Sequence, residues 1–290
     1  MISRMLNFKR AAKIFLLGPQ AILLAACVNV TPRQPIAVEQ AQQADQEAHR
    51  AMRDSNFVRA RDMFTQSLWL QQSLDNLSGT AIAMINLSMV SHRMGDDSAA
   101  LRQLDLILED GSPPYPPELR AAAAFRKAVI LVDAGVANME ISQAGAAESA
   151  LERADKECPK QCTFTPGIYN LRARLALQKN EYAAALQMVK IAMNAPSVEK
   201  EELANARRIS ASAETALGHH DTALTHYLAA LDMDKELGIS ARIVVDLNGI
   251  AKAMAQLGRK QEADAYARRA AAVLEAAHFL PESALKKLTP

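Results

Sequence analysis

A short turn signature that recurs along the chain constrains the fold more than any other feature of the sequence. Residues 217–223 read LGHHDTA, and forty residues later residues 257–263 read LGRKQEA. A degenerate copy centres on Gly135. Further copies, each followed by a small residue, lie at 54–57, 94–97 and 179–182. Self-similarity of this kind indicates a repeat protein, in which each unit buries its apolar face only against its neighbours.

Proline placement divides the chain into helical blocks, because a proline inside a helix costs about 3 kcal/mol. The segments 113–117 and 158–166 and Pro196 are therefore expected to be loops between helical pairs. Aromatic residues make up only 4% of the chain, which favours closely packed helices over strands. The sequence predicts an all-α fold. The proline-free blocks are 36–112, 118–158, 167–195 and 197–280.

Small and large residues follow the turns at helical spacing. They are Ala60, Phe64 and Leu68; Ala100; Ala185, Val189 and Ala192; Ala223, Tyr227, Ala230 and Leu231; and Ala263, Ala267 and Ala270. This pattern resembles the tetratricopeptide repeat, a helix-turn-helix unit. The resemblance implies a right-handed superhelical solenoid of about six such pairs over residues 38–280. The period near forty, rather than 34, predicts helices about one turn longer than in the commonest form.

The first helix of each unit departs from the tetratricopeptide pattern. Residues 243–254, for example, lack the Trp, Leu-Gly and Tyr that the family places there. Residues 138–157 have no clean turn signature. A generic solenoid of helical pairs is therefore the alternative to a tetratricopeptide fold.

The N-terminus has the layout of a secretory signal. Residues 1–13 are basic, residues 14–26 are mainly apolar, and the stretch ends in LLAAC at Cys27. This end resembles the bacterial lipobox, which implies a signal peptide over 1–26 and acylation of Cys27. A membrane-spanning helix is the first alternative, but the apolar segment is short and interrupted at 18–20. The second alternative, an ordinary signal, prefers a small residue where Leu24 stands.

The residues after Cys27 predict the membrane to which the chain is anchored. In the lipoproteins of diderm bacteria, the residue after the acylated cysteine sorts between the membranes, and Val28 matches an outer-membrane protein facing the periplasm. Residues 27–37 contain two prolines and are expected to form the acylated end and a tether, with the repeat domain over 38–280 and a tail over 281–290. Four basic residues precede Cys27, so without them the formal charge changes from +1 to −3. This balance excludes a basic nucleic-acid surface.

Cys158 and Cys162 form the one short motif outside the repeats. In an exported protein the two thiols can oxidise, so a small disulfide that closes this loop is expected first and free thiols second. A thioredoxin-type redox pair has two intervening residues, whereas this motif has three. A zinc site would need further ligands, and no other Cys or His lies near in the sequence.

Other polar clusters have simple structural explanations. His219, His220 and His226 lie on a turn and its following helix, but His220 and His226 are six residues apart, so they do not share a helical face. The acidic pairs at 96–97 and 201–202 open helices, where carboxylates favour the positive end of the dipole. We find no phosphate-binding loop, dinucleotide fingerprint, nucleophile elbow or HExxH motif. The sequence therefore predicts no catalytic residue, metal or cofactor.

These features favour a non-enzymatic interaction scaffold that binds a protein or peptide partner on the concave face of the solenoid. The carboxylate clamp of chaperone-binding tetratricopeptide proteins is not reproduced, so recognition of an EEVD-like tail is not implied. The candidates for the partner groove are Asn86, Arg93, Arg126, Asn170, Arg174, Arg208, Asn248 and Lys252.

Two other functions are alternatives to the scaffold. A lipid-anchored helical enzyme acting on cell-wall glycans would need an acidic residue in an enclosed groove. A cytosolic repeat regulator with a spurious signal would leave Cys27 unmodified. Tetratricopeptide lipoproteins assist outer-membrane protein assembly, pilot secretins or recruit cell-wall enzymes, and the sequence does not choose among these roles.

Overall fold

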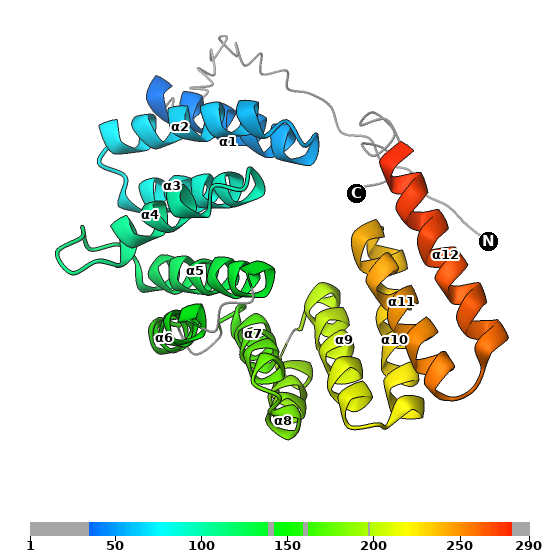
Figure 1. The fold of residues 1–290 in the computed structure, drawn as a ribbon. Helices are drawn as coiled ribbons and strands as arrows, with labels where there is room; N and C mark the ends of the chain where they lie inside the picture. Colours follow the sequence, from blue (N-terminus) through cyan, green and yellow to red (C-terminus); the bar gives the residue numbers. More distant parts are fainter. Residues whose placement is uncertain (1–34, 139–141, 159–161, 197, 280–290) are drawn as a thin grey trace, which may run out of the picture. The chain divides into compact units, whose positions relative to one another are not determined.

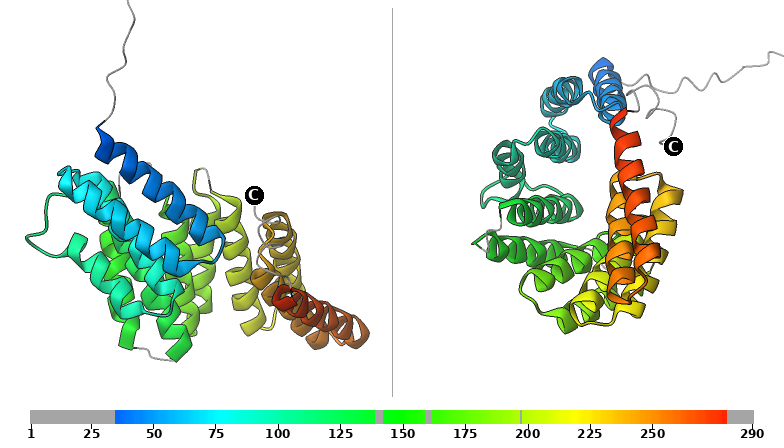
Figure 2. Two further views of the ribbon diagram at one scale, coloured as in Figure 1. Left: turned by 90° about the horizontal axis from the view of Figure 1, so that it is seen from above. Right: turned by 45° about the vertical axis from the view of Figure 1, so that its right-hand side comes forward.

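A computed structural model describes residues 35–138, 142–158, 162–196 and 198–279, which contain twelve α-helices and no strand (Figure 1). The helices pack as six successive pairs, and each also contacts the helix that follows it. The fold is thus an all-α solenoid of helical repeats, and Figure 2 shows the paired helices from two further sides. The helices are α1 (Ile36–Arg53), α2 (Phe57–Ser73), α3 (Leu77–Arg93), α4 (Asp97–Leu108), α5 (Pro117–Asn138), α6 (Ser142–Glu157), α7 (Thr165–Gln178), α8 (Tyr182–Met193), α9 (Lys200–Ala216), α10 (His220–Leu237), α11 (Ser240–Gln256) and α12 (Lys260–Phe279).

The recurring signature forms a three-residue turn within five of the six pairs. The middle residue of each turn has a positive φ, which glycine adopts most easily. The residue after it donates its backbone N–H to a carbonyl five positions earlier, as Asp96 does to Ser91 at 2.9 Å, and this bond closes the preceding helix. Side chains of Asn56 and Asp96 then cap the next helix. The positive-φ residues of these five turns are Ser55, Gly95, Asn180, Gly218 and Gly258.

Small residues after the turns pack the two helices of a pair together. Ala60, Ala100, Ala185 and Ala223 are fully buried, and the larger residue four positions on fills the gap beside each. These larger residues are Phe64, Leu104, Val189 and Tyr227, all buried. Ala267 occupies the same place in α12 but is exposed, because no described helix follows α12 to cover it.

Two details of the predicted boundaries were wrong. Gly135 does not form a turn, because α5 continues through it to Asn138. Helical neighbours such as Ala134 and Ala137 favour that continuation. The first helix begins at Ile36, so it takes up the last two residues assigned to the tether. The three proline-marked segments lie between pairs as predicted, whereas the α2–α3 connection at 74–76 and the α10–α11 connection at 238–239 contain no proline and were not predicted.

The odd-numbered helices form a continuous row from α3 to α11. Each of them contacts the next odd-numbered helix, while successive even-numbered helices show no comparable packing within the described residues. The solvent-facing side chains of this row of odd-numbered helices therefore belong to one extended face. No described helix is long and apolar enough to span a bilayer.

Candidate binding face on the odd-numbered helices

All eight candidate groove residues lie on odd-numbered helices, and six of them have accessible side chains. Arg93, Asn248 and Lys252 are exposed, and Asn86, Arg126 and Arg174 are half-buried. Asn86 and Arg93 are seven residues apart on α3, so they share one side of that helix. We refer to these six residues, together with Asp133 of α5 and Glu201 and Arg242 of the α9–α11 contact, as the odd-helix face.

Asn170 differs from the expectation, because its side chain is 3% exposed and ties α7 to α9. Its Nδ2 donates to the backbone carbonyl of Glu202 at 2.9 Å and to Oε2 of the same residue at 2.7 Å. Glu202 therefore anchors this contact as well as opening α9. Asn170 holds two neighbouring repeats together and is not available to a partner.

Arg208 of α9 is occupied by two buried carboxylates. Its Nε donates to Oδ1 of Asp246 in α11 at 2.8 Å, and its second terminal nitrogen donates to Oδ2 of Asp234 in α10. Both acids are fully buried. Burial, followed by the proximity of the Asp234 carboxyl and opposed by Arg208, raises the pKa of Asp246 to about 7. Arg208 thus joins three successive helices, and this cluster serves the fold rather than the face.

Asp133 contacts side chains of the two neighbouring odd-numbered helices. Its Oδ1 accepts a hydrogen bond from Arg174 of α7 at 2.8 Å, and its Oδ2 lies 3.7 Å from Nε2 of His92 in α3. His92 also approaches Asp97 of α4 at 2.6 Å through its Nδ1. Further along the row, Arg242 of α11 donates to Glu201 of α9 at 2.6 Å. The contacts of Asp133 connect the third repeat to the second and the fourth, and the Arg242–Glu201 pair connects the fifth to the sixth.

Arg126 of α5 lies near Arg93 of α3 on the same face. Burial and the positive charge of Arg93 lower the pKa of Arg126, whereas Asp133 and Glu201 act in the opposite direction. Unlike Arg174, Arg208 and Arg242, neither residue has a hydrogen-bonded or ion-paired partner among the described residues. The carboxylates of Asp133 and Glu201 therefore attract the charge of Arg126 without forming an ion pair with it.

Sequence reasoning missed the two buried acidic residues that hold Arg208. Asp246 stands among apolar residues in the run Val244 to Leu247, and Asp234 lies on the buried side of α10. A carboxylate inside an apolar helical stretch signals a buried partner of opposite charge. Their partner could not be chosen from sequence, because Arg208 lies 26 and 38 residues from the two acids.

The predicted cysteine motif closes the α6–α7 connection. The structure joins Cys158 to Cys162 in a disulfide, with their Cα atoms 5.5 Å apart. Cys158 packs against the apolar core formed by α3 to α7. The bond therefore links the end of one repeat to the start of the next.

The three candidate histidines do not converge on one site. Nδ1 of His219 lies 2.7 Å from Oε2 of Glu214, whereas His226 faces Arg207, whose NH1 is 3.3 Å from its Nδ1. Burial and the charge of Arg207 lower the pKa of His226. No group of three possible metal ligands occurs within the part of the chain that the structure describes.

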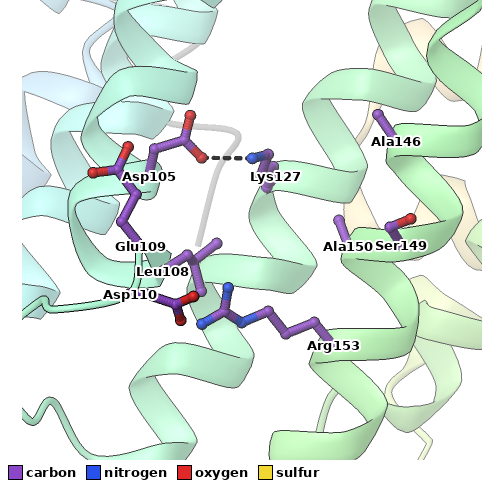
Figure 3. Close-up of a pocket in the computed structure, with 9 residues that line it drawn as sticks. All are labelled: Asp105, Leu108, Glu109, Asp110, Lys127, Ala146, Ser149, Ala150 and Arg153. Atoms are coloured by element: carbon purple, nitrogen blue, oxygen red, sulfur yellow. Dashed lines mark hydrogen bonds and ion pairs between the residues drawn. The ribbon is translucent and has the colours of Figure 1, made fainter.

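A separate open cavity lies between α4, α5 and α6 and has a volume of about 500 Å³ (Figure 3). Lys127 and Asp105 face each other across it and form an ion pair at 2.5 Å. Arg153 reaches its edge but is held by Glu157 at 2.9 Å. Lys127 and Arg153 are therefore both paired with carboxylates.

Comparisons with known proteins do not assign the chain to a family. No protein-family model matches it, and no curated protein is similar to it. The predicted lipid-attachment site Cys27, the predicted sorting residue Val28 and the segments 1–26 and 281–290 lie outside the described residues.

Proposed function

We propose that this chain is a non-enzymatic interaction scaffold of the bacterial cell envelope, held at the outer membrane through acylated Cys27. The odd-helix face carries this proposal. It presents charged and amide side chains from five successive odd-numbered helices, α3, α5, α7, α9 and α11, on one row. An extended peptide or a helix of a partner protein can contact several repeats of such a row at once.

The carboxylates of the face favour binding over glycan hydrolysis. A glycosidase needs a carboxylic acid that can give its proton to the substrate. Asp133 and Glu201 are instead paired with Arg174 and Arg242. Asp246 has the raised pKa of a general acid, but its side chain is fully buried against Arg208. These arrangements support a scaffold that assembles an envelope complex.

Membrane attachment is tested by fractionating cells that produce the wild type or Cys27→Ser. The wild type is expected in the membrane fraction and the variant in the soluble fraction, because the lipid would be attached to the Cys27 thiol. Metabolic labelling with palmitate should mark the wild type alone. A wild type found in the soluble fraction, or a variant that stays membrane-bound, would overturn the anchor.

Partner binding is tested by site-specific photo-crosslinking in the native envelope. A crosslinking amino acid at Asn248 or Lys252 of α11 places the probe on the odd-helix face. The same amino acid at Gln261 or Arg268 of α12 is the matched control, because these positions are also exposed but lie on an even-numbered helix. A discrete protein adduct is expected from α11 only. Equal adducts from both helices, or none, would contradict the scaffold proposal.

A further inference from the structure

A small cavity lies where three consecutive odd-numbered helices, α5, α7 and α9, meet (Figure 1). Its volume is about 140 Å³. Drug-sized ligands usually occupy cavities of about 300–1,000 Å³, so this one has room only for the end of a single side chain. We call it the α5–α7–α9 pocket. The residues that line it include Phe125 of α5, Phe164 and Gly167 at the start of α7, and Glu199 and Glu202 at the start of α9.

Two aromatic rings line the α5–α7–α9 pocket. The rings of Phe125 and Phe164 are stacked, with their centroids 5.5 Å apart and their planes inclined by 22°. Gly167 lets Phe125 approach α7, because a Cβ at this position would lie 2.6 Å from Cζ of that ring. Glycine is an unfavourable helix residue, so the benefit of Gly167 within α7 is the close approach that it allows.

The unpaired polar atoms at the α5–α7–α9 pocket are acceptors. Oε2 of Glu202 accepts a hydrogen bond from Asn170, while its Oε1 lies 3.3 Å from the place that a Cβ of Gly167 would take. Neither Glu199 nor Glu202 forms an ion pair within the described ranges, and none of the described residues that line the pocket is basic. Oδ1 of Asn170, which is 3% exposed, also has no hydrogen-bond partner there. These atoms favour a ligand that donates hydrogen bonds.

The charge of the two carboxylates favours a cation among such donors. The positive end of the α9 dipole offsets part of this charge, but it amounts to only about half a unit charge. Lys200, which follows Glu199 in the chain, is itself bound by Glu236 of α10. Aromatic rings attract cations as well, because their faces carry partial negative charge. The rings and the carboxylates therefore favour the same ligand, a charged nitrogen group on an apolar stem.

We propose that the α5–α7–α9 pocket binds a cationic nitrogen group of a protein partner, an inference that rests on the proposed scaffold function and names what the partner carries. The alkyl stem of a lysine or arginine would lie against the phenylalanine rings, and its charged end would donate hydrogen bonds to Glu199 and Glu202. A free N-terminal ammonium offers the same chemistry. All three helices belong to the row of odd-numbered helices that the proposed partner contacts.

The pocket is tested by measuring peptide binding to the full-length chain in detergent by fluorescence anisotropy. Four alanine-based peptides of equal length are compared. Three have both ends blocked and carry Lys, Arg or Gln at alternate positions, and the fourth is the Gln peptide with a free N-terminus. Tighter binding of the Lys or Arg peptide than of the blocked Gln peptide supports recognition of a basic side chain, and preference for the fourth assigns the cation to a chain end. Equal binding of all four, or binding of none, overturns the cation site.

A matched pair of variants separates the pocket from the general charge of the chain. Glu199 and Glu181 are both exposed, and each precedes a helix without capping it through a side-chain hydrogen bond. Glu199→Gln is expected to weaken binding of the preferred peptide by about two- to fivefold, as for an exposed ion pair. Glu181→Gln removes the same charge at α8 and should leave binding unchanged. Equal losses in the two variants would show a general charge effect and overturn the proposal.

Two further variants change the inside of the pocket. Glu202→Gln keeps an oxygen that can accept the hydrogen bond of Asn170 but loses the charge, so binding should weaken by about tenfold. Gly167→Ala places a methyl group against Phe125 and should abolish the preference for cationic peptides. Thermal unfolding shows whether Gly167→Ala is folded, and the exposed Glu199→Gln keeps the test valid if it is not. Unchanged binding in both glutamate variants contradicts the assignment.

A vesicle experiment separates a protein partner from a lipid headgroup, because phosphatidylethanolamine also carries an ammonium group. The Cys27→Ser chain is mixed with phosphatidylglycerol vesicles that do or do not contain phosphatidylethanolamine. Co-sedimentation that requires phosphatidylethanolamine and is lost in Glu202→Gln would assign the pocket to lipid instead. If α11 crosslinks to a partner but no peptide preference is found, the pocket fails and the scaffold stands. If a peptide preference is found without any crosslink, the scaffold fails in the envelope.

Discussion

Asp234 of α10 and Asp246 of α11 share one guanidinium, that of Arg208 in α9. Both carboxyls are fully buried, so each depends on this arginine for compensation. Oδ1 of Asp234 has no hydrogen-bond partner within the described structure. Burial and the neighbouring Asp234 carboxyl favour the protonated form of Asp246 and raise its pKa to about 7, although Arg208 opposes this shift.

Stability is expected to depend on pH through Asp246. Its pKa rises from 3.8 in the unfolded chain to about 7 in the folded state, so the folded state binds the proton more tightly. The stabilising contribution is complete below the unfolded pKa and is lost as the pH rises through the folded one. Between these values the free energy of unfolding should fall by about 1 kcal/mol per pH unit. Asp246→Asn should remove this slope, as measured by urea unfolding across the same range.

Other carboxylates make the free energy of unfolding rise with pH, which opposes the effect of Asp246. The titration of Asp246 is therefore measured as the difference in the free energy of unfolding between wild type and Asp246→Asn. Burial alone would raise the pKa of Glu157, but hydrogen bonds from Arg120 and Arg153 lower it overall. Glu157 therefore contributes stability that is lost as the pH falls. A difference between the two proteins that does not change with pH would refute the titration of Asp246.

Gly249 of α11 is expected to tolerate no side chain. A Cβ at this position would lie 2.5 Å from Cε1 of Tyr227, an aromatic residue of α10 that is 9% exposed. Gly249→Ala should therefore lower the free energy of unfolding by about 1–3 kcal/mol despite the better helix propensity of alanine.

Gly145 of α6 is the matched control for this substitution. It also lies within a helix, but a Cβ there would meet no atom within 4 Å. Gly145→Ala should stabilise the chain by about 0.5–1 kcal/mol. Thermal unfolding of the two variants side by side checks the pair, and a stabilised Gly249→Ala would contradict the close approach of α11 to Tyr227.

The repeat could be predicted from sequence because its determinants are local. The turn requires a positive φ at one position, and the pair contact requires a small residue four places into the next helix, as at Gly218 and Ala223. The ion-pair clusters could not be predicted, since Arg208 and Asp246 come together only after two helices have folded back on each other. Asn170 was misplaced for the same reason: its partner Glu202 lies 32 residues away.

The turns also predict which substitutions stabilise. Asn180 adopts a φ of 59° in the turn where three other repeats have glycine, and one of these glycines, Gly218, has a φ of 82°. Asn180→Gly should be neutral or stabilise by a few tenths of a kcal/mol, because it relieves the left-handed conformation. Gly218→Ala should destabilise by about 1 kcal/mol. Urea unfolding of both variants checks this prediction. A destabilised Asn180→Gly together with a stabilised Gly218→Ala would contradict the turn geometry.

The disulfide between Cys158 and Cys162 is expected to contribute modestly, because it closes a very short loop. Chain entropy predicts about 2 kcal/mol for a loop of this length. The Cys158→Ala, Cys162→Ala double variant should therefore unfold at a lower urea concentration than the wild type, by an amount equal to that caused by reducing the wild type. Reductant should have no further effect on the double variant. A chain isolated from the envelope should carry the bond, since disulfides persist in oxidising compartments, and free thiols at both positions would argue against export.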